Sequence, residues 1–402
     1  MKRRFMFLLV FVLFLFGFAE PKVTLLNNIA IDDNGLQSLK GTLASLTTDL
    51  LPIDECNPIF SPLSLYLNLS MLAETVDDEV KTALFDFISI NSIDELRDIN
   101  RAIVTSYTDK SLGKEFRLRN FLFRDRAIYQ EDLYNEDLIT QMKYYYSVYD
   151  EIINLWEEGP TKISQTIKEA TNNFLNVSKD TINQYLHKYS VNVFMNVIYF
   201  DDEWQEKFKK SEVGDMQFFN PSEEGKTVKG LIGEREGMFH EDDDYILGSL
   251  DFNQGCRMYF ILPHKDKTIE DVFRGNVIND LISKKIQPKE ATIDYKIPKF
   301  DINYQYVMTE ILKTHGLDAL FGFQEDSPFY YGDIYRYESL LQSSRIMLDE
   351  AGVKAATATL SFGCGAKAAP PFNATIHLER PFIYLIVTPQ DIILFSGIVN
   401  LL

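Results

Sequence analysis

The chain has 402 residues, of which 46% are hydrophobic and 25% are charged. This length predicts one large or two ordinary domains, and the hydrophobic content is sufficient for a substantial core, which excludes a wholly disordered chain. Lys and Arg number 40 against 59 Asp and Glu, so the formal net charge is −19. A chain this acidic is unsuited to binding nucleic acid or an anionic lipid surface.

The first nineteen residues have the pattern of a signal peptide, which is removed from the mature protein. Cations at 2–4 precede an unbroken apolar run at 5–18, and small residues then suit cleavage before Glu20. A membrane anchor is the alternative, but this run is short for a bilayer about 30 Å thick. We therefore expect a signal peptide at 1–19 and a secreted mature protein, extracellular or periplasmic, with no membrane partner.

The chain up to about residue 185 is predicted to be mainly helical. Leucines recur with helical spacing after Asn34, at positions 36, 39, 43, 46 and 50. A second helix is expected to begin with Ser61 as its N-cap and Pro62 as its first residue. The segments that follow, including the aromatic stretch at 144–146, are also interpreted as mixed helices.

From about residue 190 the pattern changes to strands. Runs of β-branched and aromatic residues occupy 191–200, 256–263, 291–302 and 382–399, and a turn at 388–391 divides the last run into a hairpin. One helix, near 306–315, interrupts this half. Helices and strands that are segregated along the chain predict an α+β fold. No internal repeat or linker is present, so we expect residues 20–402 to form a single domain.

No group of residues supports an enzyme, a metal site or a cofactor. Residues 225–227 (Gly-Lys-Thr) end like a phosphate-binding loop, but Asn220 stands where that loop requires a glycine, so we expect a turn into a strand. The histidines lack metal-ligand spacing, and the GxSxG motif of serine hydrolases is absent. Cys56, Cys256 and Cys364 allow at most one disulfide, and an unpaired Cys364 would be a candidate reactive thiol.

The segment at 351–375 consists largely of Ala, Thr, Ser and Gly. Long segments without their own secondary structure are uncommon in compact domains and are usually functional, although a tolerated disordered insertion is the alternative. The first half has the alternation of a strand with narrow side chains on one face, namely Val353, Ala355, Thr357, Thr359 and Ser361. The segment can therefore either stay extended in solvent or become a strand inside a sheet.

Several blocks of sequence together resemble the serpin family. They include NPIFSPLSLYLNLSML (57–72), VNVFMNVIYFDDEW (191–204), IPKFDINYQYVMTEILKTHGLDALF (297–321), DEAGVKAATAT (349–359) and FIYLIVTPQDIILFSGIVN (382–400). The block at 349–359 is the most specific, because it resembles the hinge pattern of Glu-x-Gly followed by small residues and Thr. The resemblance implies the serpin fold, which is α+β with three β-sheets, about nine helices and an exposed reactive-centre loop, here at about 350–375.

The resemblance implies an inhibitor that acts as a suicide substrate of a serine-type protease. The protease cuts the loop and forms a covalent acyl-enzyme, and the cleaved loop then inserts as a strand into the central sheet. The implied hinge consists of Glu350, Gly352, Val353, Ala355, Ala356, Thr357, Ala358 and Thr359. No inward position there is larger than Val353, which favours an inhibitory, monomeric member. A non-inhibitory serpin that acts as a binding or carrier protein is the alternative.

The scissile bond is expected by the same resemblance sixteen residues after Glu350, which is after Ala366. A small residue at this position resembles inhibitors of elastase-like or subtilisin-like proteases. Cleavage after Lys367 would instead indicate a trypsin-like target, and cleavage after Phe362 a chymotrypsin-like one. We rank Ala366 first and Lys367 second.

Five residues match positions that control the opening of the central sheet in this family. Ser61, Ser64 and Asn196 match a buried polar cluster between strands, and Gln342 stands where the family usually has a histidine of that cluster. Because an amide does not titrate, pH-gated opening is not expected at Gln342. Trp204 matches a tryptophan near the start of insertion, although a buried tryptophan that only belongs to the core is the alternative.

Overall fold

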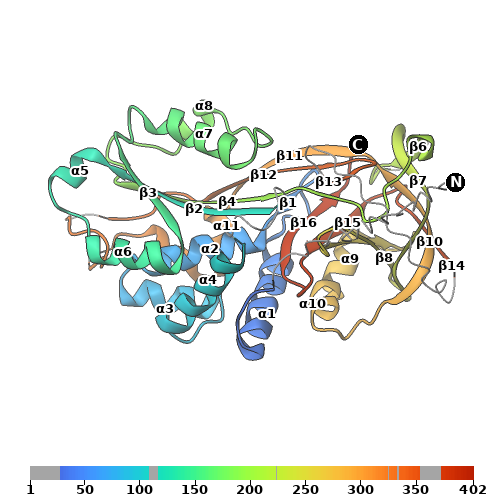
Figure 1. Ribbon diagram of the computed structural model, residues 1–402, viewed down its shortest axis with the longest axis horizontal. Coiled ribbons are helices and arrows are strands. Elements are labelled where there is room, and N and C mark those ends of the chain that lie inside the picture. Colours follow the sequence, from blue (N-terminus) through green and yellow to red (C-terminus); the bar gives the residue numbers. More distant parts are fainter. Residues whose placement is uncertain (1–27, 108–115, 223, 325, 333–334, 354–372) are drawn as a thin grey trace, which may run out of the picture.

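The computed structural model describes residues 28–107, 116–222, 224–324, 326–332, 335–353 and 373–402 (Figure 1). Several predicted features lie outside the described residues. These are the signal peptide, the hinge residues at 355–359, the three candidate cleavage positions Phe362, Ala366 and Lys367, and Cys364.

Three β-sheets form the framework of the described chain. The largest has the strand order β1-β16-β15-β9-β8-β7-β10-β14, with β6 paired to β7 off this path, and it occupies the right of Figure 1. The other two have the orders β11-β12-β13-β5 and β3-β2-β4. The strands are β1 (Ile59–Phe60), β2 (Phe116–Asp125), β3 (Val148–Ile153), β4 (Asn192–Phe200), β5 (Asp202–Glu203), β6 (Val213–Phe219), β7 (Gly225–Glu241), β8 (Tyr245–Asp251), β9 (Arg257–Pro263), β10 (Lys289–Pro298), β11 (Phe300–Val307), β12 (Leu341–Leu348), β13 (Gly352–Val353), β14 (Asn373–His377), β15 (Phe382–Val387) and β16 (Ile393–Val399).

Eleven α-helices surround the sheets in the described residues. In Figure 1, α7 and α8 lie above the β3-β2-β4 sheet, while α2, α3, α4 and α6 lie below it. The helices are α1 (Asp33–Leu50), α2 (Pro62–Ala73), α3 (Asp78–Phe87), α4 (Ile93–Tyr107), α5 (Arg126–Gln130), α6 (Glu136–Tyr145), α7 (Gly159–Ala170), α8 (Lys179–Asn183), α9 (Ile269–Arg274), α10 (Val277–Ile282) and α11 (Thr309–Leu312). The predicted α+β fold with three sheets is confirmed. None of these helices is both long and apolar enough to cross a membrane.

The helix boundaries that were predicted from capping residues agree with the structure. The Ser61 hydroxyl accepts a hydrogen bond from the Ser64 backbone N–H at the start of α2, and Pro62 is the first helical residue. The Asp32 carboxylate caps α1 in the same way, by accepting from Gly35. The predicted hairpin is also present, because β15 and β16 pair on either side of the turn at 388–391.

Three expectations from local sequence are wrong. The region before residue 185 contains three strands, β1, β2 and β3, in addition to helices. The run at 291–302 is not one strand, because it divides after Pro298 into β10 and β11, which belong to different sheets. The single helix expected in the second half, near 306–315, begins only at Thr309, since the preceding residues pair with β12, and α9 and α10 interrupt this half as well. In each case the pairing with a distant strand overrides the local preference.

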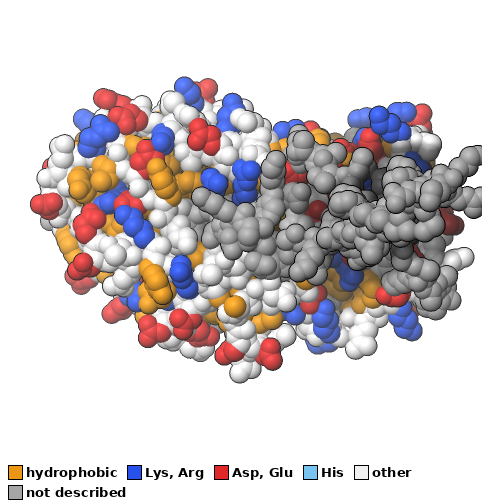
Figure 2. All heavy atoms as spheres, in the orientation of Figure 1, with side chains coloured by type: hydrophobic (Ala, Val, Ile, Leu, Met, Phe, Trp, Pro, Cys, Tyr) orange, Lys and Arg blue, Asp and Glu red, His pale blue; other side chains and the backbone are white. Residues whose placement is uncertain are grey.

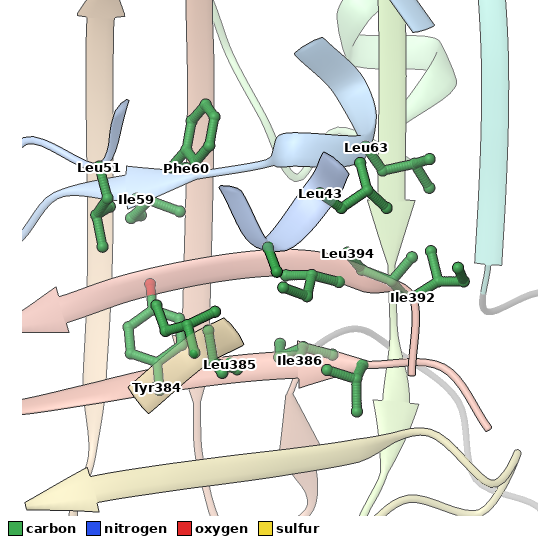
Figure 3. Close-up of a cluster of buried hydrophobic side chains, with 14 of the residues drawn as sticks. Leu43, Leu51, Ile59, Phe60, Leu63, Tyr384, Leu385, Ile386, Ile392 and Leu394 are labelled. Carbon is green, nitrogen blue, oxygen red and sulfur yellow. The ribbon is translucent and has the colours of Figure 1, made fainter. Parts of the chain in front are cut away.

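The main hydrophobic core lies where α1 and α2 meet the β1-β16-β15 part of the largest sheet. Figure 3 shows buried side chains from these elements gathered together, among them Leu43, Ile59, Phe60, Leu63, Leu385, Ile386 and Leu394. Burial of large apolar side chains is the dominant stabilising contribution in such a core. Because α2 is buried along most of its length, its first turn at Ser61 is held in a fixed position.

The two described cysteines do not form a disulfide. Cys56 is exposed and Cys256 is buried, and both are free. Burial raises the pKa of the Cys256 thiol well above its ordinary value, with the nearby Asp202 carboxylate adding to the effect. Cys256 is therefore an unreactive core residue.

Candidate functional site

A groove separates the two smaller sheets. β4 pairs with β2 and β12 pairs with β11, but no strand pairing joins β4 to β12 among the described residues. The groove has a volume of about 1410 Å³, and the strands β4 and β12 line its two walls. Residues of α2 and β16 line one face, including Ser61, Leu65 and Phe395, and residues of α7 and the segment after it line the other, including Ile163, Ile167 and Phe174.

The two walls of the groove differ in how their side chains are buried. Along β12 every second residue is buried, namely Gln342, Ser344, Ile346 and Leu348. The first five residues of β4 are only partly buried, although this strand lies in the interior of the fold. A strand with one unpaired edge exposes backbone N–H and C=O groups that can pair with another strand. The two walls of the groove therefore present the unpaired backbone groups that an additional β-strand would require.

The short strand β13 already occupies the upper end of the groove. Gly352 pairs with Glu203, and Val353 pairs with Asp202 on one side and Leu348 on the other, antiparallel in both cases. A Cβ atom on Gly352 would lie 2.2 Å from the Asp202 carbonyl oxygen, so this close approach requires glycine. The chain that leads into the predicted reactive loop thus begins as a strand between β12 and β5, the short strand that follows β4.

Two groups hold the start of the hinge against the sheet. The Lys299 Nζ lies 2.5 Å from the Glu350 carboxylate, and this hydrogen bond lowers the pKa of Glu350. The Trp204 indole N–H donates to the Asp349 carbonyl at 3.0 Å, and the Trp204 ring stacks on Phe252 at 4.6 Å. Trp204 therefore contacts the hinge directly and also belongs to the core. The pairing of Lys299 with Glu350 was missed in the sequence, because the two residues lie 51 positions apart.

Ser61 and Gln342 are joined by two hydrogen bonds across the groove floor. The Gln342 side chain accepts from the Ser61 backbone N–H at 2.8 Å and donates to the Ser61 carbonyl at 3.0 Å. The Ser61 hydroxyl also donates to the Leu394 carbonyl at 2.7 Å. Ser64 lies beside them in the groove lining. The amide thus connects β12 to α2 and β16 without a titrating group.

Asn196 lies on the other wall and has a different partner. Its amide N–H donates to the Asn120 side-chain oxygen at 2.7 Å, and the two residues are directly opposite in the pairing of β2 with β4. The Asn196 side-chain oxygen is buried and has no hydrogen-bond partner in the part of the chain that the structure describes. The structure thus brings Ser61 and Gln342 together but pairs Asn196 with Asn120, which the sequence did not single out.

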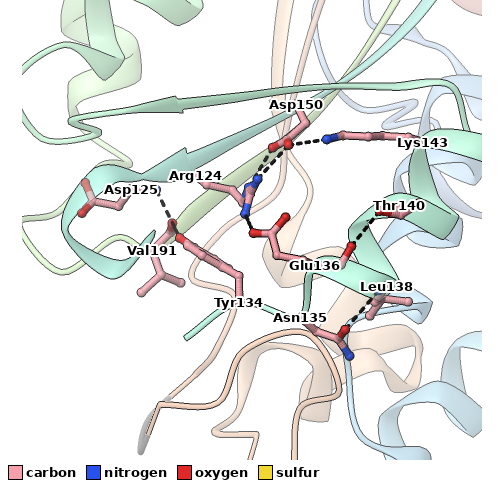
Figure 4. Close-up of polar contacts among 10 residues, drawn as sticks. All are labelled: Arg124, Asp125, Tyr134, Asn135, Glu136, Leu138, Thr140, Lys143, Asp150 and Val191. Atoms are coloured by element: carbon pink, nitrogen blue, oxygen red, sulfur yellow. Dashed lines mark hydrogen bonds and ion pairs between the residues drawn. The ribbon is translucent and has the colours of Figure 1, made fainter. Parts of the chain in front are cut away.

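Ion pairs between two buried side chains, those of Arg124 and Asp150, and two exposed side chains of α6 connect β2 and β3 to that helix (Figure 4). The Arg124 guanidinium donates two hydrogen bonds of 2.8 Å to Asp150 and one of 2.5 Å to Glu136, and Lys143 lies 2.7 Å from Asp150. Burial alone would raise the pKa of Asp150, but the hydrogen bonds from Arg124 and Lys143 hold it below its ordinary value. The β4 wall of the groove is therefore part of a firmly connected unit.

Comparisons with known proteins agree with this geometry. The family model described as "Serpin (serine protease inhibitor)" matches residues 44–401. The chain is 24% identical over 350 residues to Serpin-Z1 of Arabidopsis thaliana, spanning 83% of this chain and 85% of that protein. Among solved structures, the thermophilic serpin Tengpin in its native state is similar with a TM-score of 0.75 at 20% identity, covering 92% of this chain and 95% of that one.

A second solved structure widens the range of functions within the family. Human thyroxine-binding globulin in complex with its hormone is similar with a TM-score of 0.76 at 19% identity, covering 91% of this chain and 99% of that one. That protein is named for binding thyroxine, whereas the description of the family model names a serine protease inhibitor. The family model covers most of the chain, so the resemblance seen in the sequence is confirmed and the protein belongs to the serpin family.

Proposed function

We propose that the protein is a secreted inhibitory serpin that traps a serine-type protease as a suicide substrate. The observation that carries this proposal is the groove between β4 and β12 with β13 at its upper end, which leads directly into the segment at 354–372. Cleavage of that segment would free its first half to continue β13 along the groove as a full strand. The protease, still attached as an acyl-enzyme, would be carried along with it.

The register of β13 predicts which side chains would meet the walls. Continuing the antiparallel pairing from Val353 opposite Leu348 would bring Ala355, Thr357 and Thr359 opposite Ile346, Ser344 and Gln342, all buried on β12. Continuing it on the other side, from Val353 opposite Asp202, would bring Thr359 opposite Asn196. The Thr359 hydroxyl could then donate to the Asn196 oxygen, which has no other partner.

The free energy available from insertion is large enough to drive the trap. Each new backbone hydrogen bond contributes about 0.5–1.5 kcal/mol net, so a dozen or two would contribute on the order of 10–20 kcal/mol. Narrow side chains such as Ala and Thr enter the groove without displacing its lining, which supports insertion over simple hydrolysis of the loop.

The bond to be cut follows from the same proposal. The protease serine would attack the carbonyl carbon of Ala366, the amide bond to Lys367 would break, and the amine of Lys367 would leave with a proton. Ala366 would remain as an ester on the protease. A small side chain at this position supports an elastase-like or subtilisin-like target, while cleavage after Lys367 or Phe362 would change the target class.

The surface supports a protein partner and not a nucleic acid. In the left half of the face shown in Figure 2, acidic and basic side chains are interspersed and do not form a basic patch. The net charge of −19 argues in the same direction. We further propose that the protein acts as a monomer outside the cell. Serpins include both secreted and intracellular proteins, and the signal-peptide pattern at 1–19 supports secretion here.

A non-inhibitory binding or carrier function is the second candidate. The fold similarity to thyroxine-binding globulin is the observation in its favour, since that structure contains a bound hormone. The unbroken run of small residues in the hinge favours inhibition, because a carrier does not need an insertable strand.

The test is incubation of the protein with pancreatic elastase, a subtilisin and trypsin in turn, followed by a denaturing gel and mass measurement of the released fragment. A denaturant-stable complex and a fragment that begins at Lys367 would support both the trap and the Ala366 assignment. Clean cleavage without a complex would refute inhibition and favour the carrier function.

A further inference from the structure

A series of hydrogen bonds between buried and half-buried groups, one of them to a backbone carbonyl, connects the groove to helices on the other side of the sheet. Asn196 donates to the Asn120 side-chain oxygen at 2.7 Å, and the Asn120 amide donates to the Tyr146 carbonyl oxygen at 2.7 Å. The Tyr146 hydroxyl donates to Glu74 at 2.8 Å, and Arg97 donates to both Glu74 oxygens at 2.8 Å. These hydrogen bonds thus link β4 to α2 and α4.

The orientation of each amide in this series of hydrogen bonds is fixed, because a carbonyl oxygen can only accept a hydrogen bond and an amide NH₂ can only donate one. Tyr146 therefore orients the Asn120 amide with its NH₂ toward α6 and its oxygen toward Asn196. Asn196 must then turn its own NH₂ toward Asn120. Its oxygen is left as a buried acceptor without a partner, in a residue that lines the groove.

The far end of this series of hydrogen bonds is firmly held. Tyr146 is fully buried, and burial, with the Glu74 carboxylate adding to it, raises the pKa of the Tyr146 hydroxyl well above its ordinary value, so this group remains a donor. Glu74 is also buried, and its charge is compensated by the guanidinium of Arg97. A buried carboxylate that is paired and hydrogen-bonded in this way has one stable arrangement.

We propose that Glu74, Arg97, Tyr146 and Asn120 are positioning residues for strand insertion. They hold the Asn196 oxygen as an acceptor at the groove, so a strand that enters the groove gains a hydrogen bond at this point. The proposal rests on the proposed function and deepens it. Residues that do not contact the inserted strand would influence the stability of the cleaved, inserted form. An unpaired buried acceptor is unfavourable, so its satisfaction on insertion adds to the stability of the cleaved form.

The test compares the thermal midpoints of the intact protein and of protein cleaved in the segment 354–372 by elastase, with the cut verified by mass. Tyr146→Phe keeps the carbonyl that accepts from Asn120 and removes only the hydroxyl through which Glu74 holds Tyr146 in place. Tyr384→Phe is the matched control, since its buried hydroxyl has no hydrogen-bond partner among the described residues. We expect the rise in midpoint on cleavage to be smaller by about 1–3 °C in Tyr146→Phe and unchanged in Tyr384→Phe. In an Asn196→Ala background, Tyr146→Phe should no longer change the rise.

The outcomes separate a positioning role from a structural one. If Tyr146→Phe lowers the midpoints of the intact and cleaved forms equally, the rise is unchanged and the positioning role is refuted, while insertion itself stands. If the wild-type protein shows no rise on cleavage, insertion fails and the positioning role fails with it. Asn120→Leu removes the hydrogen bonds to Asn196 and Tyr146 directly and should reduce the rise in thermal midpoint further. If this variant does not fold, the comparison of Tyr146→Phe with Tyr384→Phe still tests the positioning role.

Discussion

Gly352→Ala tests the start of the inserted strand with the smallest possible change. An added Cβ would lie 2.2 Å from the Asp202 carbonyl oxygen and 2.6 Å from the Glu203 Cα. Both are backbone atoms of β5, so they cannot turn aside as the end of a flexible side chain could. We expect β13 to be displaced from β5, with loss of its pairing on that side.

The magnitude follows from two opposing effects. Overpacking in a buried site destabilises by about 1–3 kcal/mol. Replacing Gly by Ala also restricts the unfolded chain, which stabilises the folded protein by about 0.4–1 kcal/mol. The net loss of about 1–2 kcal/mol would be measured as a lower midpoint of urea unfolding. Gly41→Ala is the control, because Gly41 is exposed within α1 with nothing within 4 Å of an added Cβ, and it should stabilise the protein by up to about 1 kcal/mol.

Gly352→Ala should also lower the yield of the covalent complex with the protease. With β13 displaced, insertion would begin more slowly, and more of the acyl-enzyme would hydrolyse before the loop has moved. The assay is the ratio of covalent complex to cleaved inhibitor on a denaturing gel at equal amounts of protease. Wild-type values for both the unfolding midpoint and this ratio would refute the argument that Gly352 is required at the mouth of the groove.

Three further predictions follow from individual contacts. Glu350→Gln removes the ion pair with Lys299, which is partly exposed and contributes about 0–1 kcal/mol. Because the hydrogen bond from Lys299 lowers the pKa of Glu350 from 4.5, this contribution is present above about pH 4.5 and is lost as the pH falls through the lowered pKa. The difference in thermal midpoint between wild type and variant should therefore shrink as the pH falls below 4.5, and a constant difference would contradict the pairing. Arg124→Met leaves the buried Asp150 without its main partner and should lower the free energy of unfolding by about 3–5 kcal/mol, whereas a loss below 1 kcal/mol in urea titration would contradict the network. Gly397→Ala would bring a Cβ within 2.2 Å of a tyrosine hydroxyl and should destabilise by about 1–3 kcal/mol, measured by calorimetry; an unchanged midpoint would show that the core can adjust there.

The sequence predicts those features of the fold that depend on neighbouring residues. Ser61 and Pro62 determine the start of α2 through local hydrogen bonding and a fixed φ angle, and the turn at 388–391 determines the hairpin in the same way. The hinge at 349–359 is recognisable because its small residues form one continuous block.

The features that were missed depend on residues that are far apart in the chain. Asn120 and Asn196 are 76 residues apart, and Tyr146 and Glu74 are 72 apart, so no local pattern indicates either pair. The strand β2 lies between two partner strands in its sheet, and that pairing outweighs its local preferences. The division of 291–302 between two sheets depends likewise on the strands with which each part pairs.

The most direct test of strand insertion is hydrogen–deuterium exchange of the two groove walls, measured by mass spectrometry before and after cleavage of the segment 354–372. The account predicts that backbone amides of β4 (Asn192–Phe200) and β12 (Leu341–Leu348) that face the groove become strongly protected on cleavage, because they acquire hydrogen-bond partners from a new strand. The strands β2 and β11, which already pair with the walls, serve as internal references and should change little. Unchanged exchange in both walls after verified cleavage would contradict insertion and with it the proposed inhibitory mechanism.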